Sequence, residues 1–182
     1  AFAVAVVTTS SLSAETTPKG SIFQPVLAEQ GMVSVQEAVA TRIGVEILQR
    51  GGNAIDAAVA VGFALSVTLP RAGNLGGGGF MMVHESATGK TQAIDYREVA
   101  PAAATRGMFL NAAGEYDRTK AVGSHLSVGV PGTVAGFAMA LERFGTMSLA
   151  EVIQPALKLA SEGIVVTRGL AESLTSRRKE KM

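Results

Sequence analysis

Residues 73–101 read GNLGGGGFMMVHESATGKTQAIDYREVAP, a run of glycines followed by two apolar stretches with a short polar loop between them. Two short apolar stretches joined by a glycine-containing loop predict a β-hairpin, with strands over 80–83 and 92–96. An antiparallel register in which the residues beside the loop pair with each other carries the second strand back toward the glycines. We therefore expect Arg97 to lie opposite the glycines around Gly79.

This juxtaposition predicts an anion-recognising pocket at the mouth of the hairpin. Glycines let a backbone approach a ligand closely, and the planar guanidinium of Arg97 presents donors that suit a carboxylate or a phosphate. The alternative is that the glycines form a flexible or tightly packed connection and that Arg97 is an ordinary surface residue. For the two neighbouring carboxylates we expect structural roles, with Asp95 bracing Arg97 and Glu98 pointing to solvent.

Two helices are expected before the glycines. Ser34 and Glu37 have the spacing of a capping box, which predicts a helix that begins after Ser34 and stops at the glycine pair 51–52. Its apolar stripe consists of Val35, Val39, Ile43 and Ile47. Asn53 is placed to cap a second helix over 54–67, which is apolar on nearly all sides and is therefore expected to be buried in the core.

After the hairpin we expect an irregular segment over 100–123 with a turn over 111–114, and then more helices. One helix begins around 130–133 and stops at Gly145. A second capping box, Ser148 with Glu151, opens a helix that ends at Gly163. Its inward residues are expected to be Val152, Ala156, Leu157 and Ala160. A short strand over 164–166 and a last helix capped by Thr167 complete the expected order.

The composition indicates a globular domain or part of a larger one. The 182 residues are 47% hydrophobic and 17% charged, which is apolar enough for a sizeable core. A formal charge of +1 gives no reason to expect nucleic acid or an acidic membrane surface as a partner. The absence of cysteine excludes disulfides and thiolate chemistry from this chain. For the isolated His84 and His125 we expect structural roles.

The beginning of the chain predicts export. Residues 1–14, AFAVAVVTTSSLSA, have the apolar stretch and small residues of the end of a secretory signal, although a disordered or strand-forming segment is the alternative. We divide the sequence into this secretory remnant at 1–14, a polar lead-in at 15–30 and a partial domain at 31–182. The expected location is the periplasm or the medium.

Several common catalytic motifs are missing from the sequence. The glycines lack the G-x-x-x-x-G-K-[ST] spacing of a phosphate loop, and they precede a strand, whereas a dinucleotide fingerprint opens a helix. The sequence also contains no G-x-S-x-G elbow and no H-E-x-x-H motif.

Other motifs resemble a known family. NLGGGGF, DYREVAP, ATRGMF, SHLSVGVPGTVAGF and FGTMSLAEVIQPALKLASEG resemble the large subunit of bacterial γ-glutamyltransferases. The preceding GMVSVQEAVATRIGVEILQRGGNAIDAAVAVGFALSVTLP is similar to the segment that opens the same family. The resemblance runs from about Gly31 to Leu174, so it covers nearly all of the chain, and 31–182 is read as part of that large subunit.

The resemblance implies an α+β fold, the αββα four-layer sandwich of N-terminal nucleophile hydrolases, of which this chain is the N-terminal part. One precursor cuts itself into a large and a small subunit. The new N-terminal threonine of the small subunit attacks the γ-glutamyl amide of glutathione or related compounds, its α-amine being a suitable base. Water, an amino acid or a peptide then takes the γ-glutamyl group. The expected partners are these molecules and the small subunit; no metal, organic cofactor, nucleic acid or membrane is expected once the signal is removed.

The resemblance also assigns one residue. In the family, the arginine of the D-[YF]-R-E motif binds the α-carboxylate of the γ-glutamyl substrate, and Arg97 occupies that place here. The chain stops at Met182, before the self-cleavage point and the catalytic threonine, so no catalytic residue is assigned and the chain alone is expected to be inactive. Two alternatives remain: a related acylase that removes a dicarboxylic side chain from a β-lactam nucleus, and a truncated, non-catalytic binding polypeptide.

Overall fold

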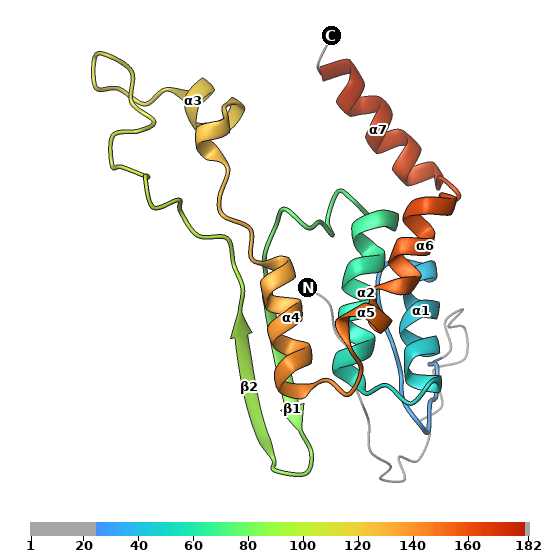
Figure 1. Ribbon diagram of the computed structural model, residues 1–182. Helices are drawn as coiled ribbons and strands as arrows, with labels where there is room; N and C mark the ends of the chain where they lie inside the picture. Colours follow the sequence, from blue (N-terminus) through green and yellow to red (C-terminus); the bar gives the residue numbers. More distant parts are fainter. Residues whose placement is uncertain (1–24, 181–182) are drawn as a thin grey trace.

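The computed structural model describes residues 25–180, in which helices pack beside a single hairpin (Figure 1). The helices are α1 (Ala38–Gln49), α2 (Ala54–Thr68), α3 (Arg118–Gly123), η1, a 3-10 helix (His125–Ser127), α4 (Thr133–Phe144), α5 (Leu149–Val152), α6 (Gln154–Glu162) and α7 (Arg168–Glu180). The strands are β1 (Phe80–Glu85) and β2 (Lys90–Asp95). This mixture of helices and strands agrees with the expected α+β class. The predicted secretory remnant lies outside the described residues, as do residues 15–24 of the lead-in.

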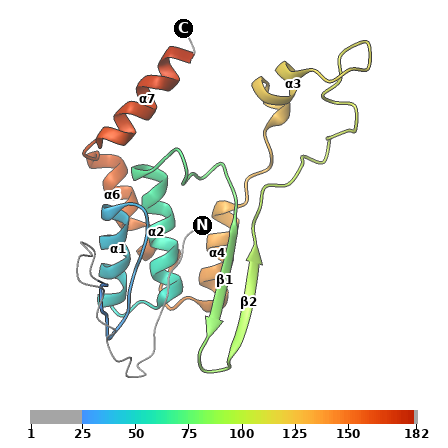
Figure 2. The ribbon, with the colours of Figure 1, turned by 180° about the vertical axis from the view of Figure 1, so that it is seen from behind.

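The centre of the fold is α2, which packs against α1, α4, α5 and α6 (Figures 1 and 2). Its sequence AIDAAVAVGFALSVT is apolar on every side, so burying it removes a large hydrophobic area from water at roughly 25 cal/mol per Å². The small side chains also allow neighbouring helices to approach closely. The buried apolar side chains of α2 are Ala57, Val59, Ala60, Val61, Phe63, Ala64 and Leu65. The prediction of a buried core helix over 54–67 is confirmed.

The hairpin also forms as predicted. β1 and β2 pair antiparallel, and Glu85 pairs with Lys90 at the loop while Phe80 pairs with Asp95 at the open end. One face of the hairpin lies against α4 (Figure 2), and Val83 and Ile94 are buried there. The side chain of Met82 points the other way and is exposed, because successive residues of a strand face opposite sides.

The first predicted capping box is wrong. α1 begins at Ala38, and Glu37 is its N-cap, with side-chain oxygens that accept hydrogen bonds from the backbone N–H groups of Val39 and Ala40 at 3.0 and 2.8 Å. Ser34 lies in an isolated bridge instead. A carboxylate near a helix N-terminus satisfies the free N–H groups and interacts well with the helix dipole, so Glu37 caps the helix by itself.

The segment expected to be irregular contains a helix. α3 forms because the side chain of Asp117 accepts hydrogen bonds from the N–H groups of Thr119 and Lys120. The predicted turn before it is present, since the Gly114 N–H donates to the Asn111 carbonyl at 3.0 Å. Together with η1, this segment forms an arm over 100–129 that extends away from the helical layer and returns to it at Val130 (Figure 1).

The helix predicted between Ser148 and Gly163 is two helices. The capping box of Ser148 and Glu151 is confirmed, but α5 ends at Val152 and α6 begins at Gln154. Pro155 lies in the first turn of α6, and because proline has no N–H it cannot continue the hydrogen-bond ladder of α5. Val152 and Ala156 are buried as expected, whereas Leu157 and Ala160 are exposed.

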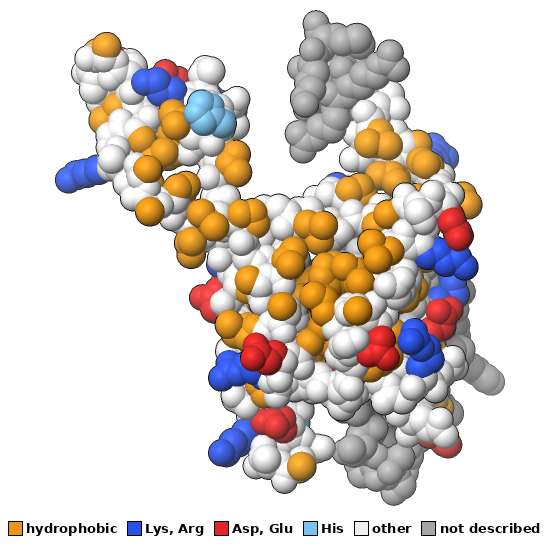
Figure 3. Space-filling model, in the orientation of Figure 1, with side chains coloured by type: hydrophobic (Ala, Val, Ile, Leu, Met, Phe, Trp, Pro, Cys, Tyr) orange, Lys and Arg blue, Asp and Glu red, His pale blue; other side chains and the backbone are white. Residues whose placement is uncertain are grey.

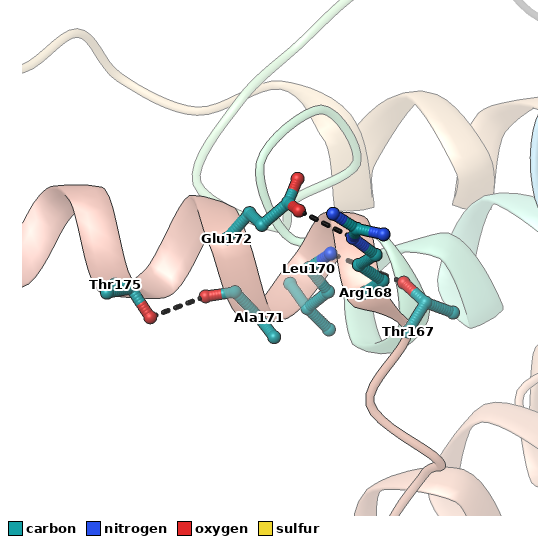
Figure 4. Close-up of polar contacts among 6 residues, drawn as sticks. All are labelled: Thr167, Arg168, Leu170, Ala171, Glu172 and Thr175. Atoms are coloured by element: carbon teal, nitrogen blue, oxygen red, sulfur yellow. Dashed lines mark hydrogen bonds and ion pairs between the residues drawn. The ribbon is translucent and has the colours of Figure 1, made fainter.

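The strand predicted over 164–166 is also wrong, because no strand pairs with these residues within the described part of the chain. The predicted cap of the last helix is present, since the Thr167 hydroxyl accepts a hydrogen bond from the Leu170 N–H at 3.3 Å (Figure 4). α7 then projects beyond the helical layer (Figure 1). None of the helices within residues 25–180 combines the length and apolar content needed to span a membrane.

One buried carboxylate ties the start of α2 to the turn between α4 and α5. Asp56 is fully buried and accepts hydrogen bonds from the N–H groups of Asn53 (2.7 Å), Thr146 (3.0 Å) and Met147 (3.1 Å) and from the Thr146 hydroxyl (2.6 Å). Asn53 adds a bond from its amide to the Phe144 carbonyl at 2.6 Å. Apart from the bond between Asn53 and Asp56, these bonds join residues 90 or 91 positions apart in the chain.

We predict that Asp56→Ala lowers the free energy of unfolding of the full-length protein by about 3–5 kcal/mol, because buried N–H donors of two chain segments lose their acceptor. Asp117→Ala is the matched control, since it removes the partly exposed cap of α3 alone and is expected to cost about 1 kcal/mol. Denaturant unfolding measures both. Equal effects of the two substitutions would contradict the role assigned to Asp56.

The cap of α1 predicts a dependence of stability on pH. Partial burial pushes the pKa of Glu37 upward, but the hydrogen bonds from the Val39 and Ala40 N–H groups, with smaller contributions from Thr68 and Arg42, hold it below its usual value of 4.5. The pKa is thus lower in the folded than in the unfolded protein. The resulting stabilisation is complete above the unfolded pKa and is lost as the pH falls through the folded pKa.

We therefore predict that Glu37→Gln reduces the loss of stability that the parent protein shows on acidification below about pH 4.5. The measurement is the free energy of unfolding as a function of pH. Glu46→Gln is the control, because Glu46 is exposed on the same helix and its side chain accepts no hydrogen bond from the described residues. An unchanged pH profile for Glu37→Gln would contradict the prediction.

Candidate functional site

The register of the hairpin brings Arg97 back to the glycines, as predicted. Beyond the last strand pair, the Tyr96 N–H donates to the Gly79 carbonyl at 2.9 Å and the Gly79 N–H donates to the Tyr96 carbonyl at 3.2 Å. Arg97 is the next residue, so its backbone lies beside Gly78. A further pair of backbone hydrogen bonds joins Val99 to Val130 and closes the base of the arm.

The glycine run packs tightly against this segment. A Cβ atom on Gly78 would lie 2.4 Å from the Tyr96 carbonyl oxygen and 2.7 Å from the Glu98 nitrogen, distances that real Cβ atoms do not reach. One on Gly79 would lie 3.2 Å from the ring of Tyr96. Of the two interpretations of the glycines, close packing against the protein itself is therefore confirmed for these positions.

Arg97 is held at its backbone, while most of its side chain is exposed. Its N–H donates to Asp95 Oδ1 at 3.0 Å, so Asp95 braces the main chain of Arg97 as expected, although it does not touch the guanidinium. The side chain of Arg97 is 59% exposed. The guanidinium carries five N–H donors, and none of them makes a hydrogen bond to the described residues.

Glu98 does not point to solvent, which corrects the expectation for this residue. Its side chain is 31% exposed, and Oε2 lies 3.1 Å from Nη1 of Arg97. That distance makes an ion pair, but the guanidinium N–H is not directed at the oxygen, and Oε2 is shielded from solvent without a hydrogen-bond partner among the described residues. An exposed pair of this kind contributes little to stability. It does keep a carboxylate beside the arginine.

A hollow of about 560 Å³ opens beside Arg97, between the outgoing and returning legs of the arm. Among the described residues, Arg97 and Glu98 are the charged residues in its wall. The remaining lining is apolar or small: Val99, Ala100, Pro101, Ala104, Thr105, Met108, Phe109, Leu126, Ser127, Val128 and Gly129. Figure 3 shows apolar side chains along the arm and over the middle of the same face, between α4 and α6. The arrangement places one cationic group, paired with the carboxylate of Glu98, at the edge of a mostly apolar surface.

Tyr96 anchors the residue next to Arg97. Its ring contacts Phe137 of α4 edge-on, with 5.8 Å between the ring centroids, and Phe137 contacts Phe63 of α2 in the same manner at 5.1 Å. Burial raises the pKa of the Tyr96 hydroxyl above its usual value. The sequence reasoning missed this anchor. The sequence signal for this contact is the pair Gly132 and Gly136, four residues apart. Because neither residue has a side chain, the start of α4 can lie close to Tyr96.

The other polar groups provide no competing site. His84 lies on the outer face of the hairpin with its Nδ1 2.9 Å from the Thr91 hydroxyl, and His125 is exposed in η1. Residues 25–180 contain no group of three or more histidine, aspartate or glutamate side chains arranged to hold a metal ion. A shallow hollow on α7 is formed by one helix alone, beside the exposed Arg168–Glu172 ion pair (Figure 4), and we assign it no function.

Comparison with known proteins identifies the family. The family model described as Gamma-glutamyltranspeptidase matches residues 40–182. The chain is 59% identical over 153 residues to the glutathione hydrolase proenzyme of Escherichia coli (strain K12), an alignment that covers 84% of this chain and 26% of that protein. It is 42% identical to the acylase ACY 1 proenzyme of Pseudomonas sp. (strain V22), over 84% of this chain and 28% of the relative.

The structure agrees with these matches. The γ-glutamyltranspeptidase of Helicobacter pylori superimposes with a TM-score of 0.82 at 44% identity, over 85% of this chain and 44% of the other. The chain spans about a quarter of the length of the curated relatives that it matches, 26% of the Escherichia coli protein and 28% of the Pseudomonas acylase proenzyme. Its helices and hairpin are part of the α+β fold of an N-terminal nucleophile hydrolase. The chain belongs to the γ-glutamyltranspeptidase family.

Proposed function

We propose that the full-length protein is a γ-glutamyltransferase that cleaves the γ-glutamyl amide of glutathione and related compounds, and that this chain supplies the donor-binding arginine. The observation that carries the proposal is Arg97, which is fixed at its backbone while its guanidinium lies beside a hollow and makes no hydrogen bond to the described residues, only an ion pair with the adjacent Glu98. The glutathione hydrolase name of the Escherichia coli relative supports the choice of substrate.

The chemistry of the donor explains why an arginine is useful there. The γ-glutamyl group ends in an α-carboxylate, which a guanidinium can bind through two parallel hydrogen bonds. Such a charge-assisted contact contributes about 1.5–3 kcal/mol. A donor without the carboxylate leaves Arg97 unpaired. The contact therefore selects glutamyl donors over simple acyl amides.

The proposed reaction takes place on a threonine supplied by the remainder of the protein. The threonine hydroxyl attacks the γ-carbonyl carbon and passes its proton to the neighbouring α-amine. The amide C–N bond then breaks, the leaving amine takes the proton, and the γ-glutamyl group remains as an ester on the threonine. Water or the amine of an acceptor amino acid or peptide cleaves this ester. In this proposal residues 1–182 bind the donor but do not catalyse alone.

We predict that Arg97→Ala in the processed enzyme raises the KM for glutathione by roughly 10- to 150-fold, the equivalent of about 1.5–3 kcal/mol. Arg97→Lys keeps the charge but loses the two-point contact, so an intermediate increase is expected. Arg71→Ala is the control, because Arg71 is exposed in the loop before the glycines. Steady-state hydrolysis measures all three variants. An unchanged KM for Arg97→Ala would exclude the assigned role.

We also predict that the full-length precursor yields two chains, the smaller of which begins with threonine. The proenzyme names of the relatives support this expectation. Intact-mass measurement with N-terminal sequencing of the purified protein is the test. A single unprocessed product that still hydrolyses glutathione would contradict the proposed mechanism, and one that is inactive would favour a non-catalytic binding role.

A β-lactam side-chain acylase is the second candidate, because a named acylase proenzyme is 42% identical to this chain. Both candidates use a donor with a carboxylate, so Arg97 does not separate them. The ratio of kcat/KM for glutathione to that for a β-lactam carrying a dicarboxylic acyl side chain does. A ratio above one favours the transferase, and a ratio below one favours the acylase.

A further inference from the structure

The segment 96–98 is enclosed by glycines from two distant parts of the chain. Gly78, from the loop before β1, lies against it on one side: an added Cβ would be 2.9 Å from the Arg97 carbonyl carbon. Gly132, at the start of α4, lies against it as well. A Cβ there would be 2.1 Å from the Tyr96 carbonyl oxygen and 2.8 Å from its carbonyl carbon.

At both positions glycine is needed because a larger residue has no room, and not because the backbone adopts a conformation that favours glycine. The glycines with left-handed φ values are Gly51, Gly89, Gly114 and Gly163, so neither Gly78 nor Gly132 is among them. The atoms that an added methyl group would meet are backbone atoms, which cannot turn aside as the end of a flexible side chain can. An alanine at either position therefore has to push the main chain of residues 96–98.

The two glycine segments are also joined to each other. The Gly77 carbonyl accepts hydrogen bonds from the N–H groups of Gly132 at 2.9 Å and Thr133 at 3.1 Å, and so satisfies donors at the start of α4 that no side chain caps. Residues 77–79, 96–98 and 130–133 thus form one connected backbone unit. Both glycines lie against main-chain atoms of Tyr96 and of Arg97 itself, so the backbone from which the Arg97 side chain starts is packed on both of them.

We propose that Gly78 and Gly132 are positioning residues that set the place of the Arg97 guanidinium, and through it the affinity and selectivity for donors with an α-carboxylate. This inference rests on the proposed function of Arg97. The glycines do not touch the donor themselves. Because the long side chain of Arg97 starts from the enclosed backbone, a shift or tilt of that backbone displaces the guanidinium at its far end by at least a comparable distance.

The glycine run contains its own matched control. A Cβ on Gly76 would meet only Asn74 Oδ1, at 3.8 Å, which is an ordinary contact. Gly76→Ala and Gly78→Ala therefore make the same chemical change two positions apart, and only the second displaces the backbone of Arg97. Both substitutions are made in the full-length processed enzyme, alone and combined with Arg97→Ala.

We expect Gly78→Ala to raise the KM for glutathione by about 10- to 100-fold, because it weakens the charge-assisted contact that Arg97→Ala removes, while kcat stays within about twofold. Gly76→Ala should leave both constants unchanged. In the Arg97→Ala background, Gly78→Ala should have little further effect, because a contact that is already lost cannot be weakened again. A general structural defect would instead lower the activity of both backgrounds equally.

Two results would overturn the inference: an effect of Gly78→Ala on kcat alone, or an increase in KM that persists in full without Arg97. If Arg97→Ala by itself leaves the KM for glutathione unchanged, the proposed role of Arg97 is wrong. That measurement does not involve the glycine variants, so it distinguishes failure of the proposed function from failure of the inference about the glycines. Should Gly78→Ala not give processed enzyme, Gly79→Ala provides a milder change, with its Cβ 3.2 Å from the Tyr96 ring. It is expected to raise the KM less, with the same dependence on Arg97.

Discussion

The backbone pairing of Gly79 with Tyr96 is the interaction on which the site depends. It extends the hairpin beyond its last strand pair, and it holds the segment of Arg97 against the glycine loop. The start of α4 is attached to the same loop through the Gly77 carbonyl. A sheet edge, a loop and a helix N-terminus are thus connected by main-chain hydrogen bonds, which do not depend on flexible side chains. The backbone of Arg97 is held by this unit, whereas more than half of its side chain is exposed.

The helical layer supports this unit from behind. α2 is buried because its alanine, valine and leucine side chains leave no polar face, and its start is fixed by Asp56 to the turn that follows α4. Phe137 connects α4 to α2 on one side and to Tyr96 on the other. The placement of an exposed arginine therefore depends on contacts that continue through an aromatic row into the centre of the core.

Apolar surface remains outside this unit. The exposed side chains include Phe80 and Met82 on the outer face of the hairpin, Val134 and Met139 on α4, and Leu157 on α6. Figure 3 shows such side chains gathered on one face and along the arm. The chain spans about a quarter of the length of the curated relatives that it matches.

Local signals in the sequence determined the hairpin and its register, the buried character of α2, and the helix boundaries at Asn53, Gly145 and Ser148, because turn chemistry, apolar periodicity and capping are short-range effects. Motifs recognised in the sequence also determined the family. The separation of α5 from α6 at Pro155 is also a local effect of the sequence. The tertiary structure alone decided that no strand pairs with the described residues 164–166, that Asp56 joins α2 to the turn after α4, and that glycines 54 positions apart enclose one backbone segment. Those outcomes depend on which distant segments meet, and the spacing of residues along the chain does not encode that contact locally.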